Sequence, residues 1–298
     1  MYQTFLVPLD GSKLAERAVP VAAQLAQATH ARIVLMQAIG VHVAEARTYL
    51  GEIAIGLRGR GLHVETIVAP EPAAEAIVSF VRTRPVDMVI MSTHGRSGLG
   101  RAVFGSVAEA VLAHSHVPLL LLRAAKDVPD FGPMVHPRIL VPLDGSHFAE
   151  AALPHAAALT KALDGTLVLS EVCLEPVDMS IWNANTKQLL NDIERIHQRE
   201  RRHAEGYLAH LQVQFEAEGL KVETCVCRGA PGERVRQQCE QLGANLVVMA
   251  THGRSGLSRA ILGSVALDVL HHGHLPMLLV HPSAVTPTQT PLEAIPVR

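Results

Sequence analysis

The amino-acid sequence contains an internal duplication, which limits the folds open to it. The stretch FLVPLDGS, beginning at Phe5, returns as ILVPLDGS at Ile139, 134 residues later. A second stretch, STHGRSGLGRAVFGS from Ser92, returns as ATHGRSGLSRAILGS from Ala250, 158 residues later. Repetition of this kind indicates two copies of one folding unit. The two offsets differ by 24 residues, so the second copy carries that many more after the equivalent of Ala38.

Each copy alternates short apolar runs with longer amphipathic or alanine-rich stretches, which indicates alternating strands and helices. Only 3% of the residues are aromatic, so Val, Leu, Ile and Ala must build the core, as is typical of parallel strands covered on both faces. We therefore predict an α/β fold of two repeated, open, five-stranded parallel sheets, with ligands bound beyond the carboxyl ends of the strands. The expected strands are Thr4–Leu9, Arg32–Ala38, Val64–Ala69, Asp87–Ser92 and Leu119–Leu122, then Arg138–Leu143, Thr166–Val172, Val222–Cys227, Asn245–Ala250 and Met277–Val280.

The duplication also predicts the domain organisation: a first domain over residues 1–124, a linker over 125–136, a second domain over 137–281 and a mobile tail over 282–298. The second copy contains an insertion, Cys173–Gln214, with a charged helical stretch. We expect this helix to pack on its own domain, with an interface to another chain as the second interpretation. Pro20 and Pro154 fall inside the first expected helix of each copy, where we expect a kink and not two separate helices.

Charge and composition exclude several classes of protein. The formal net charge is −2, so no overall field favours nucleic acid or a membrane surface, and an anion site must be local. The first residues have no basic region followed by an apolar run, and no stretch approaches the roughly 20 apolar residues of a membrane span. All four cysteines lie in the second copy without counterparts in the first. We expect a cytoplasmic protein.

The glycine-rich stretch of each copy has the features of an anion site. In the second copy it follows an apolar strand and ends in Gly263-Ser264, at the start of the last helix, where unpaired backbone N–H groups and the helix dipole attract phosphate. Ser264 is expected to donate its hydroxyl or to act as the N-cap. Glycines let the preceding loop approach an anion closely, and His252 and Arg254 add side-chain donors. The alternative is that the glycines form only a surface turn and a helix start.

A carboxylate lies on the same rim. Asp144, and Asp10 in the first copy, follow the first strand and are placed to accept hydrogen bonds from ribose hydroxyls. The alternative is a local turn or helix cap ahead of Ser146. Neither GxxxxGK[ST] nor GxGxxG after a first strand occurs, so a P-loop ATPase and an ordinary NAD-binding domain are excluded.

With these motifs the chain resembles the universal stress protein family (UspA-like) in its tandem two-domain form, over nearly all of both copies. The family signature is G-x2-G-x9-G-[ST], and both Gly253 to Gly263-Ser264 and Gly95 to Gly105-Ser106 fit it. The glycine that ends the preceding strand in the family is replaced by Ala250 and Ser92. The resemblance implies a Rossmann-like fold of the adenine nucleotide alpha-hydrolase type, and pairing of the two domains through their last strands, PLLLL and PMLLV.

The resemblance further implies bound adenine nucleotide, namely ATP with or without Mg²⁺. In the second copy the implied binding residues are Pro142, Asp144, Val172, Ala250, His252, Gly253, Arg254, Gly256, Gly263, Ser264 and Val265. In the first copy they are Pro8, Asp10, Ala38, Ser92, His94, Gly95, Arg96, Gly98, Gly105, Ser106 and Val107.

The copies differ after the third strand. The second has Gly229 and Gly232, expected near the site, whereas the first has Glu71 at the position of Gly229, where a carboxylate would repel phosphate. We therefore expect the second copy to be the better nucleotide site.

Three functions remain open at this point. No residue is placed to activate water, so we expect at most slow ATP hydrolysis and interpret the nucleotide as the ligand of a switch in a stress response. The alternatives are a nucleotide-independent dimerisation module or scaffold, and an adenylyl-transferring enzyme on a related fold. A homodimer is compatible with each of them.

Histidines and cysteines also raise the question of a metal. His271, His272 and His274 lie at the end of the last expected helix, where cations complement the helix dipole, and this is the preferred interpretation. Cys225 and Cys227 share one face of a strand, and buried thiols are the preferred interpretation. No metal site is predicted.

Overall fold

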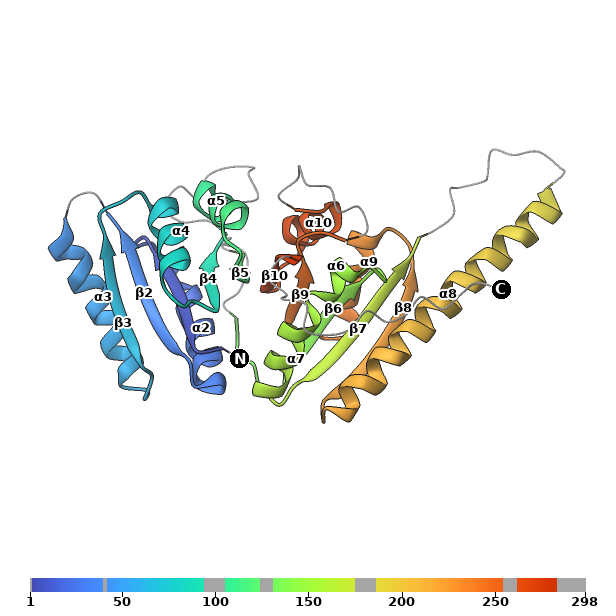
Figure 1. Ribbon diagram of the computed structural model, residues 1–298, viewed down its shortest axis with the longest axis horizontal. Helices are drawn as coiled ribbons and strands as arrows, with labels where there is room; N and C mark the ends of the chain where they lie inside the picture. Colours follow the sequence, from blue (N-terminus) through green and yellow to red (C-terminus); the bar gives the residue numbers. More distant parts are fainter. Residues whose placement is uncertain are drawn as a thin grey trace.

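The computed structural model describes residues 2–39, 42–93, 105–123, 131–174, 186–253 and 262–282. Within these residues the strands form one sheet in the order β3-β2-β1-β4-β5-β10-β9-β6-β7-β8 (Figure 1). Neighbouring strands run parallel within each repeat, and β5 and β10 run antiparallel where the repeats meet. The strands are β1 (Thr4–Leu9), β2 (Arg32–Ala38), β3 (Val64–Ala69), β4 (Met88–Ser92), β5 (Leu119–Leu122), β6 (Arg138–Leu143), β7 (Thr166–Cys173), β8 (Lys221–Arg228), β9 (Leu246–Ala250) and β10 (Met277–Val280).

This arrangement confirms the predicted repeated α/β fold, and the expected strand ends differ from the observed ones by at most one residue. Both repeats have the same internal strand order, and the antiparallel pair β5–β10 is the pairing of last strands that the family resemblance implied. The boundaries of the two domains stay a prediction.

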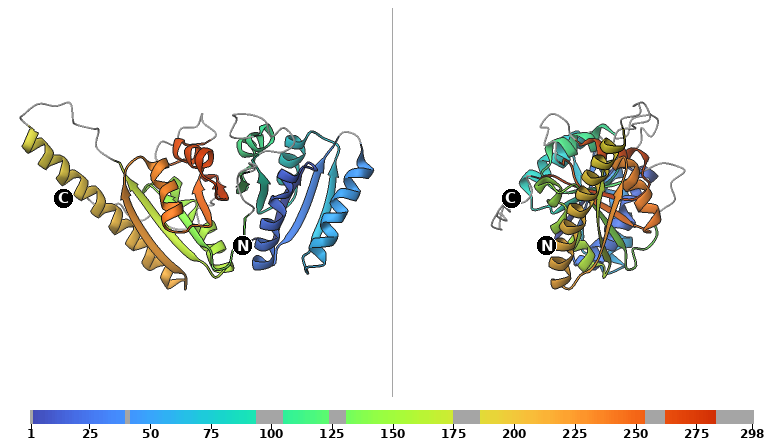
Figure 2. Two further views of the ribbon diagram at one scale, coloured as in Figure 1. Left: turned by 180° about the vertical axis from the view of Figure 1, so that it is seen from behind. Right: turned by 90° about the vertical axis from the view of Figure 1, so that its right-hand side faces the viewer.

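Helices cover both faces of the sheet (Figures 1 and 2). One face carries α4 (Ala73–Thr83), α5 (Ser106–His114), α9 (Pro231–Gln241) and α10 (Ser264–His272). The other face carries α1 (Lys13–Glu16), α2 (Ala18–Thr29), α3 (Val43–Arg58), α6 (His147–Glu150), α7 (Leu153–Ala162) and α8 (Thr186–Ala217).

The two faces hold separate cores, and each core continues across the repeat junction. Leu120 and Leu278 pair across β5 and β10 and belong to the core under α2 and α7, while Leu121 and Met277 pair and belong to the core under α5 and α10. All four side chains are at most 1% exposed. Because alternate residues of a strand point to opposite faces, these short strands contribute to both cores at once.

The prediction of one kinked helix at each proline is wrong. α1 ends at Glu16 and α2 begins at Ala18; α6 ends at Glu150 and α7 begins at Leu153. Pro20 and Pro154 have no N–H to donate to the carbonyl four residues earlier, and that carbonyl belongs to the last residue of the preceding helix in each case. The residue between α1 and α2, Arg17, keeps right-handed helical angles (φ −60°, ψ −21°), so the two helices are separated by a break in the hydrogen-bond ladder.

The inserted helix α8 packs along the outer strands through residues of its C-terminal half. Leu208, Leu211 and Phe215 are buried in the core, whereas Ile196 is 56% exposed. In Figures 1 and 2 the N-terminal part of α8 extends past β8, beyond the body of the sheet. The first interpretation, a helix packed on its own repeat, is therefore confirmed for residues near Leu208 and Leu211, and Ile196 does not belong to the packed face.

A buried polar contact also joins the repeats. The Tyr2 hydroxyl lies 2.8 Å from Nδ1 of His155 on α7, and both residues are buried. Burial lowers the pKa of His155 to about 4, so its ring is neutral at neutral pH. The segment before β6 packs against the first repeat as well, since the Met134 N–H donates to Gln24 Oε1 at 2.6 Å.

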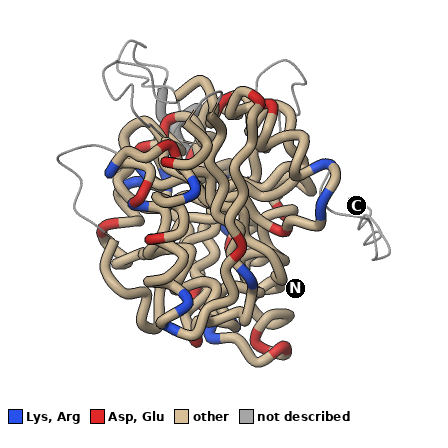
Figure 3. Tube along the Cα trace, turned by 90° about the vertical axis from the view of Figure 1, so that its left-hand side faces the viewer, with Lys and Arg blue, Asp and Glu red and all other residues tan. Residues whose placement is uncertain are grey.

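Acidic and basic residues are interspersed along the chain. Figure 3, seen from the α3 side, shows residues of both signs scattered over this view of the chain. None of the described helices is long and apolar enough to cross a membrane.

Candidate functional site

The carboxylate at the end of the first strand lies in the same setting in both repeats. Asp144 follows β6, and its Oδ1 accepts hydrogen bonds from the backbone N–H (3.0 Å) and the hydroxyl (2.6 Å) of Ser146. Ser146 Oγ in turn accepts from the Ala149 N–H and caps α6. The local turn that the sequence left as an alternative is therefore present, and it uses one oxygen of the carboxylate.

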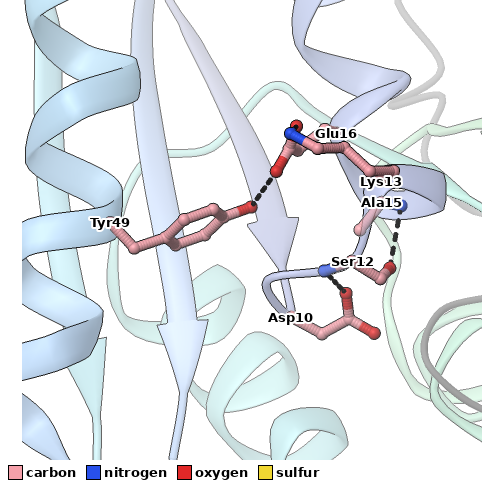
Figure 4. Close-up of polar contacts among 6 residues, drawn as sticks. All are labelled: Asp10, Ser12, Lys13, Ala15, Glu16 and Tyr49. Atoms are coloured by element: carbon pink, nitrogen blue, oxygen red, sulfur yellow. Dashed lines mark hydrogen bonds and ion pairs between the residues drawn. The ribbon is translucent and has the colours of Figure 1, made fainter.

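In the first repeat, Asp10 Oδ1 accepts from the Ser12 N–H at 2.9 Å, and Ser12 Oγ accepts from the Ala15 N–H at 3.2 Å (Figure 4). Both aspartates are thus fixed at the carboxyl end of a central strand. A fixed carboxylate is preorganised to accept from a ligand hydroxyl.

The glycine turn of the second repeat lies against the other oxygen of this carboxylate. A Cβ placed on Gly253 would be 2.3 Å from Asp144 Oδ2. A side chain at this position would displace the Asp144 carboxylate, so close approach accounts for the glycine and a special backbone angle does not. The structure therefore brings together Asp144 of the VPLD motif and Gly253, the first glycine of the THGRSG motif, which are about 110 residues apart in the chain.

The start of the last helix lies beside the same turn. Gly263 is the N-cap of α10 (φ −66°, ψ 156°), and its N–H donates to the Thr251 carbonyl at 2.7 Å. Gly105 is the N-cap of α5, and its N–H donates to the Thr93 carbonyl at the same distance. No cap side chain bonds the first-turn amides of either helix, and the start of α10 lies against Thr251 and His252, next to Gly253.

The role of N-cap expected of Ser264 is wrong. Ser264 and Ser106 are the first helical residues, because glycine takes the extended N-cap conformation at both helix starts. A donor role for the serine hydroxyl stays a prediction. Val265 and Val107 follow and pack partly buried against the core.

The remaining expected residues fall at the carboxyl ends of adjacent strands. Pro142 and Val172 lie near the ends of β6 and β7, and Ala250 ends β9 with His252 two residues beyond. Since β7, β6 and β9 are neighbours, these positions share one rim with Asp144. Pro8, Ala38 and Ser92 occupy the equivalent places on β1, β2 and β4. Outside the described residues lie His94, Gly95, Arg96, Gly98, Arg254 and Gly256.

Gly229 and Gly232 have packing roles that the sequence analysis missed. A Cβ on Gly232 would lie 2.2 Å from Asp268 Oδ2 and 2.8 Å from Asp268 Cβ, so glycine lets α9 approach α10. Gly229 has φ +142°, and a Cβ there would meet the Arg234 side chain. Across the same helix pair, Arg236 Nε lies 3.3 Å from Asp268 Oδ2.

A tyrosine–glutamate pair lies next to the aspartate in both repeats and was also missed. The Tyr207 hydroxyl donates to Glu150 Oε1 at 2.9 Å, and the Tyr49 hydroxyl donates to Glu16 Oε1 at 3.3 Å (Figure 4). Burial and the neighbouring glutamate raise the pKa of each tyrosine. Asp144 adds to the rise in the pKa of Tyr207, and Asp10 to that of Tyr49. Glu150 follows Glu16 by 134 residues and Tyr207 follows Tyr49 by 158, the same two offsets that relate the repeats. This repetition is the sequence signal from which the pairs could have been predicted.

The structure also places the histidines and cysteines that raised the question of a metal site. His272 Nδ1 lies 3.0 Å from Asp268 Oδ1 at the end of α10, and the four cysteines are free thiols. Cys225 and Cys227 both accept from Gln238 Nε2, at 3.2 and 3.4 Å, and burial raises the pKa of the Cys227 thiol. Over the part of the chain that the structure describes, no group of three histidine, cysteine or acidic side chains could hold a metal ion.

Comparison with known proteins places this arrangement in a family. The model of the universal stress protein family matches residues 1–55, 41–123 and 136–281, so the chain belongs to the universal stress protein family, with its signature repeated. Universal stress protein MJ0531 of Methanocaldococcus jannaschii is 30% identical over 151 residues, covering 50% of this chain and 84% of the relative. A universal stress protein of Mycolicibacterium smegmatis is 25% identical over 222 residues, covering 74% of this chain and 70% of the relative.

Two solved structures share the whole two-repeat fold. A universal stress protein from Archaeoglobus fulgidus superposes with a TM-score of 0.66 at 20% identity, covering 93% of this chain and 96% of the other. PA1789 from Pseudomonas aeruginosa, a protein of unknown function, superposes with a TM-score of 0.69 at 19% identity, covering 94% and 93%. At these identities the likeness shows a common fold.

Proposed function

We propose that the second repeat binds an adenine nucleotide, with ATP as the first candidate, and that the protein acts as a ligand-dependent switch in a stress response with little or no turnover. The observation that carries this proposal is the close approach of Gly253 to Asp144 beside the open start of α10. The positive end of the helix dipole beside a glycine turn suits the phosphates of a nucleotide. The fixed carboxylate on the same rim suits its ribose.

The chemistry assigns different parts of the ligand to different groups. The first-turn amides of α10 and the positive end of its dipole would bind phosphate oxygens. Asp144 would accept from a ribose hydroxyl, as an acidic residue does in dinucleotide folds. Pro142 and Val172 would border the adenosine. Mg²⁺, if it enters, would come with the ATP phosphates.

A switch needs binding alone. A ligand that binds one conformation in preference shifts the population toward it, and at a concentration of about 100 Kd it stabilises that state by roughly 2.7 kcal/mol. ATP that orders the rim would therefore change the surface offered to a partner. A homodimer and a cytoplasmic location stay predictions.

The test starts from the purified protein. Heat denaturation should release copurified adenine nucleotide into the supernatant, and ATP should raise the thermal unfolding temperature more than GTP does. Absence of both effects would support the nucleotide-independent scaffold. Formation of an adenylylated product with a defined acceptor would support the transferase interpretation.

A glycine variant tests the geometry itself. Gly253→Ala places a Cβ against Asp144 Oδ2 and displaces the carboxylate from its position on the rim, so we expect ATP affinity to fall about tenfold. Gly206→Ala on α8 is the matched control, because a Cβ there meets nothing within 4 Å. Equal ATP affinity in Gly253→Ala and Gly206→Ala would contradict the proposed site.

A further inference from the structure

Three histidine rings come together between the repeat junction and the rim of the second site. The ring of His281 lies 5.7 Å from that of His116, centroid to centroid, at an interplanar angle of 83°. It also lies 6.4 Å from the ring of His252, at an interplanar angle of 73°. His116 belongs to the first repeat and the other two belong to the second, so both repeats contribute to this histidine cluster.

The strand pairing explains why these residues meet. β5 and β10 run antiparallel, and Leu119 pairs with Leu279, so the segment that leads into β5 lies beside the end of β10. His116 precedes β5, and His281 directly follows Val280, the last residue of β10.

The cluster is continuous with the proposed phosphate site. The Thr251 N–H donates to the Val280 carbonyl at 2.9 Å, which sets His252 beside His281. The Thr251 carbonyl accepts from the Gly263 N–H at 2.7 Å, so the same residue anchors the start of α10.

The equivalent place in the first repeat is built differently. The 158-residue offset relates His281 to Arg123 and His116 to His274. The Arg123 guanidinium donates to the Gly273 carbonyl at 2.8 Å, at the C-terminal end of α10. The first repeat therefore has a permanent cation bound to a helix end, whereas the second has imidazole rings that face one another.

The surroundings decide how the cluster responds to charge. His116 and His252 are two titratable groups that face His281. The last turn of α5 carries His114, whose Nδ1 bonds the Ala110 carbonyl, and the first turn of α10 has no acidic residue. Burial, His116 and His252 all lower the pKa of His281, so the ring is neutral at neutral pH. A neighbouring anion acts in the opposite direction.

We propose that His116, His281 and His252 form a proton-linked extension of the second phosphate site, in which a bound polyphosphate draws a proton from solvent onto the imidazoles. This proposal rests on nucleotide binding by the second repeat. The ligand class is an adenine nucleotide with two or more phosphates, since the cluster is joined through Thr251 to the start of α10 and a longer phosphate chain can reach both. Affinity then rises as pH falls, because the bound state holds more protons than the free state.

The experiment is calorimetric titration of ATP, adenosine and inorganic tripolyphosphate at about pH 6, 7 and 8, in buffers of different ionisation enthalpy. The ratio of wild-type to His116→Asn/His281→Asn affinity should rise roughly three- to tenfold for ATP from pH 8 to pH 6. This ratio removes the titration of ATP itself. Tripolyphosphate should show the same trend, and adenosine should show none. Proton uptake on ATP binding should be smaller in the double variant, which keeps His252, than in the wild type.

Two controls keep the result interpretable. His116 is exposed, so His116→Asn should unfold like the wild type and lose part of the proton uptake. His274 is the second-repeat equivalent of His116 and lies outside the histidine cluster, so His274→Asn should keep the full proton uptake on ATP binding. ATP binding with the same pH dependence in wild type and double variant overturns the extension and leaves the proposed function intact. Absence of ATP binding at every pH overturns both.

Discussion

The two repeats share one apolar framework and differ at polar positions around it. Val34 and Val168 are equivalent, and both are 1% exposed in the same core. At the rims the equivalents diverge: Gln37 in the first repeat is Glu171 in the second, and Arg123 is His281. The fold tolerates these exchanges because strand pairing and apolar burial hold it, so two copies of one fold can have different site chemistry.

The helix pair behind each rim differs in the same manner. In the second repeat Gly232 and Asp268 bring α9 and α10 together, with Arg236 beside Asp268. The equivalents in the first repeat are Ala74 and Ala110, which need no glycine and carry no charge. The second repeat therefore has an ion pair between these helices, with Asp268 at the position where the first repeat has alanine, and this difference can be removed by mutation.

The largest expected effect is a loss of stability in acid that arises from His155. Its equivalent in the first repeat is Val21, which cannot take up a proton. His155 is protonated more readily in the unfolded chain, where its pKa is about 6.5, than in the folded protein, where its pKa is about 4. The contribution of neutral His155 to the free energy of unfolding is therefore fully present above pH 6.5. It falls by about 3 kcal/mol as the pH drops through 4. Urea denaturation across this range measures it.

The reference for this effect is the Tyr2→Phe/His155→Val variant, which should lose that part of the acid sensitivity. Tyr2→Phe alone keeps His155 buried and should retain most of it. An identical decline of stability with pH in the wild type and the double variant would show that His155 does not titrate in this way.

The next effect concerns the close packing of α9 against Asp268 of α10. Gly232→Ala places a Cβ against Asp268 and should lower the free energy of unfolding by about 2 kcal/mol. In the Asp268→Ala background, which copies the first repeat, the same change should cost less than about 0.5 kcal/mol. Chemical denaturation of the four members of this double-mutant cycle measures the difference, and simple additivity would contradict the packing explanation.

The smallest effect compares the two tyrosine–glutamate pairs. Tyr207→Phe removes a 2.9 Å bond to Glu150 and should cost about 1 kcal/mol. Tyr49→Phe removes a 3.3 Å bond to Glu16, which also pairs with Lys13 at 2.7 Å, and should cost about half as much. Thermal unfolding of both variants checks the order, and a larger loss for Tyr49→Phe would reverse the ranking.

The strands of each repeat could be predicted from the sequence, because the signals for strands are local and each of them occurs in both repeats. Runs such as LLLL and MLLV predict strands wherever they occur, and the duplication supplied a second observation of each. The broken helices before Pro20 and Pro154 were missed because propensity does not say whether a helix bends or splits at proline. That outcome depended on the carbonyls of Glu16 and Glu150, which end α1 and α6.

The site was predictable only where one motif carries its own chemistry. The aspartate and the glycine turn could be placed on one rim, yet their contact depends on a distance between Gly253 and Asp144 that no local pattern encodes. The packing role of Gly232 and the histidine cluster were not found, because each depends on residues brought together by helix packing or by the β5–β10 pair.

The central claim is that the second repeat is the stronger nucleotide site, and titration of ATP against Gly263→Val and Gly105→Val tests it most directly. A Cβ on Gly263 would lie 3.3 Å from the Thr251 carbonyl, and valine would place its methyl groups over the first-turn amides of α10. We expect Gly263→Val to weaken ATP binding at least about tenfold and Gly105→Val less than about twofold. A greater loss in Gly105→Val would contradict the account.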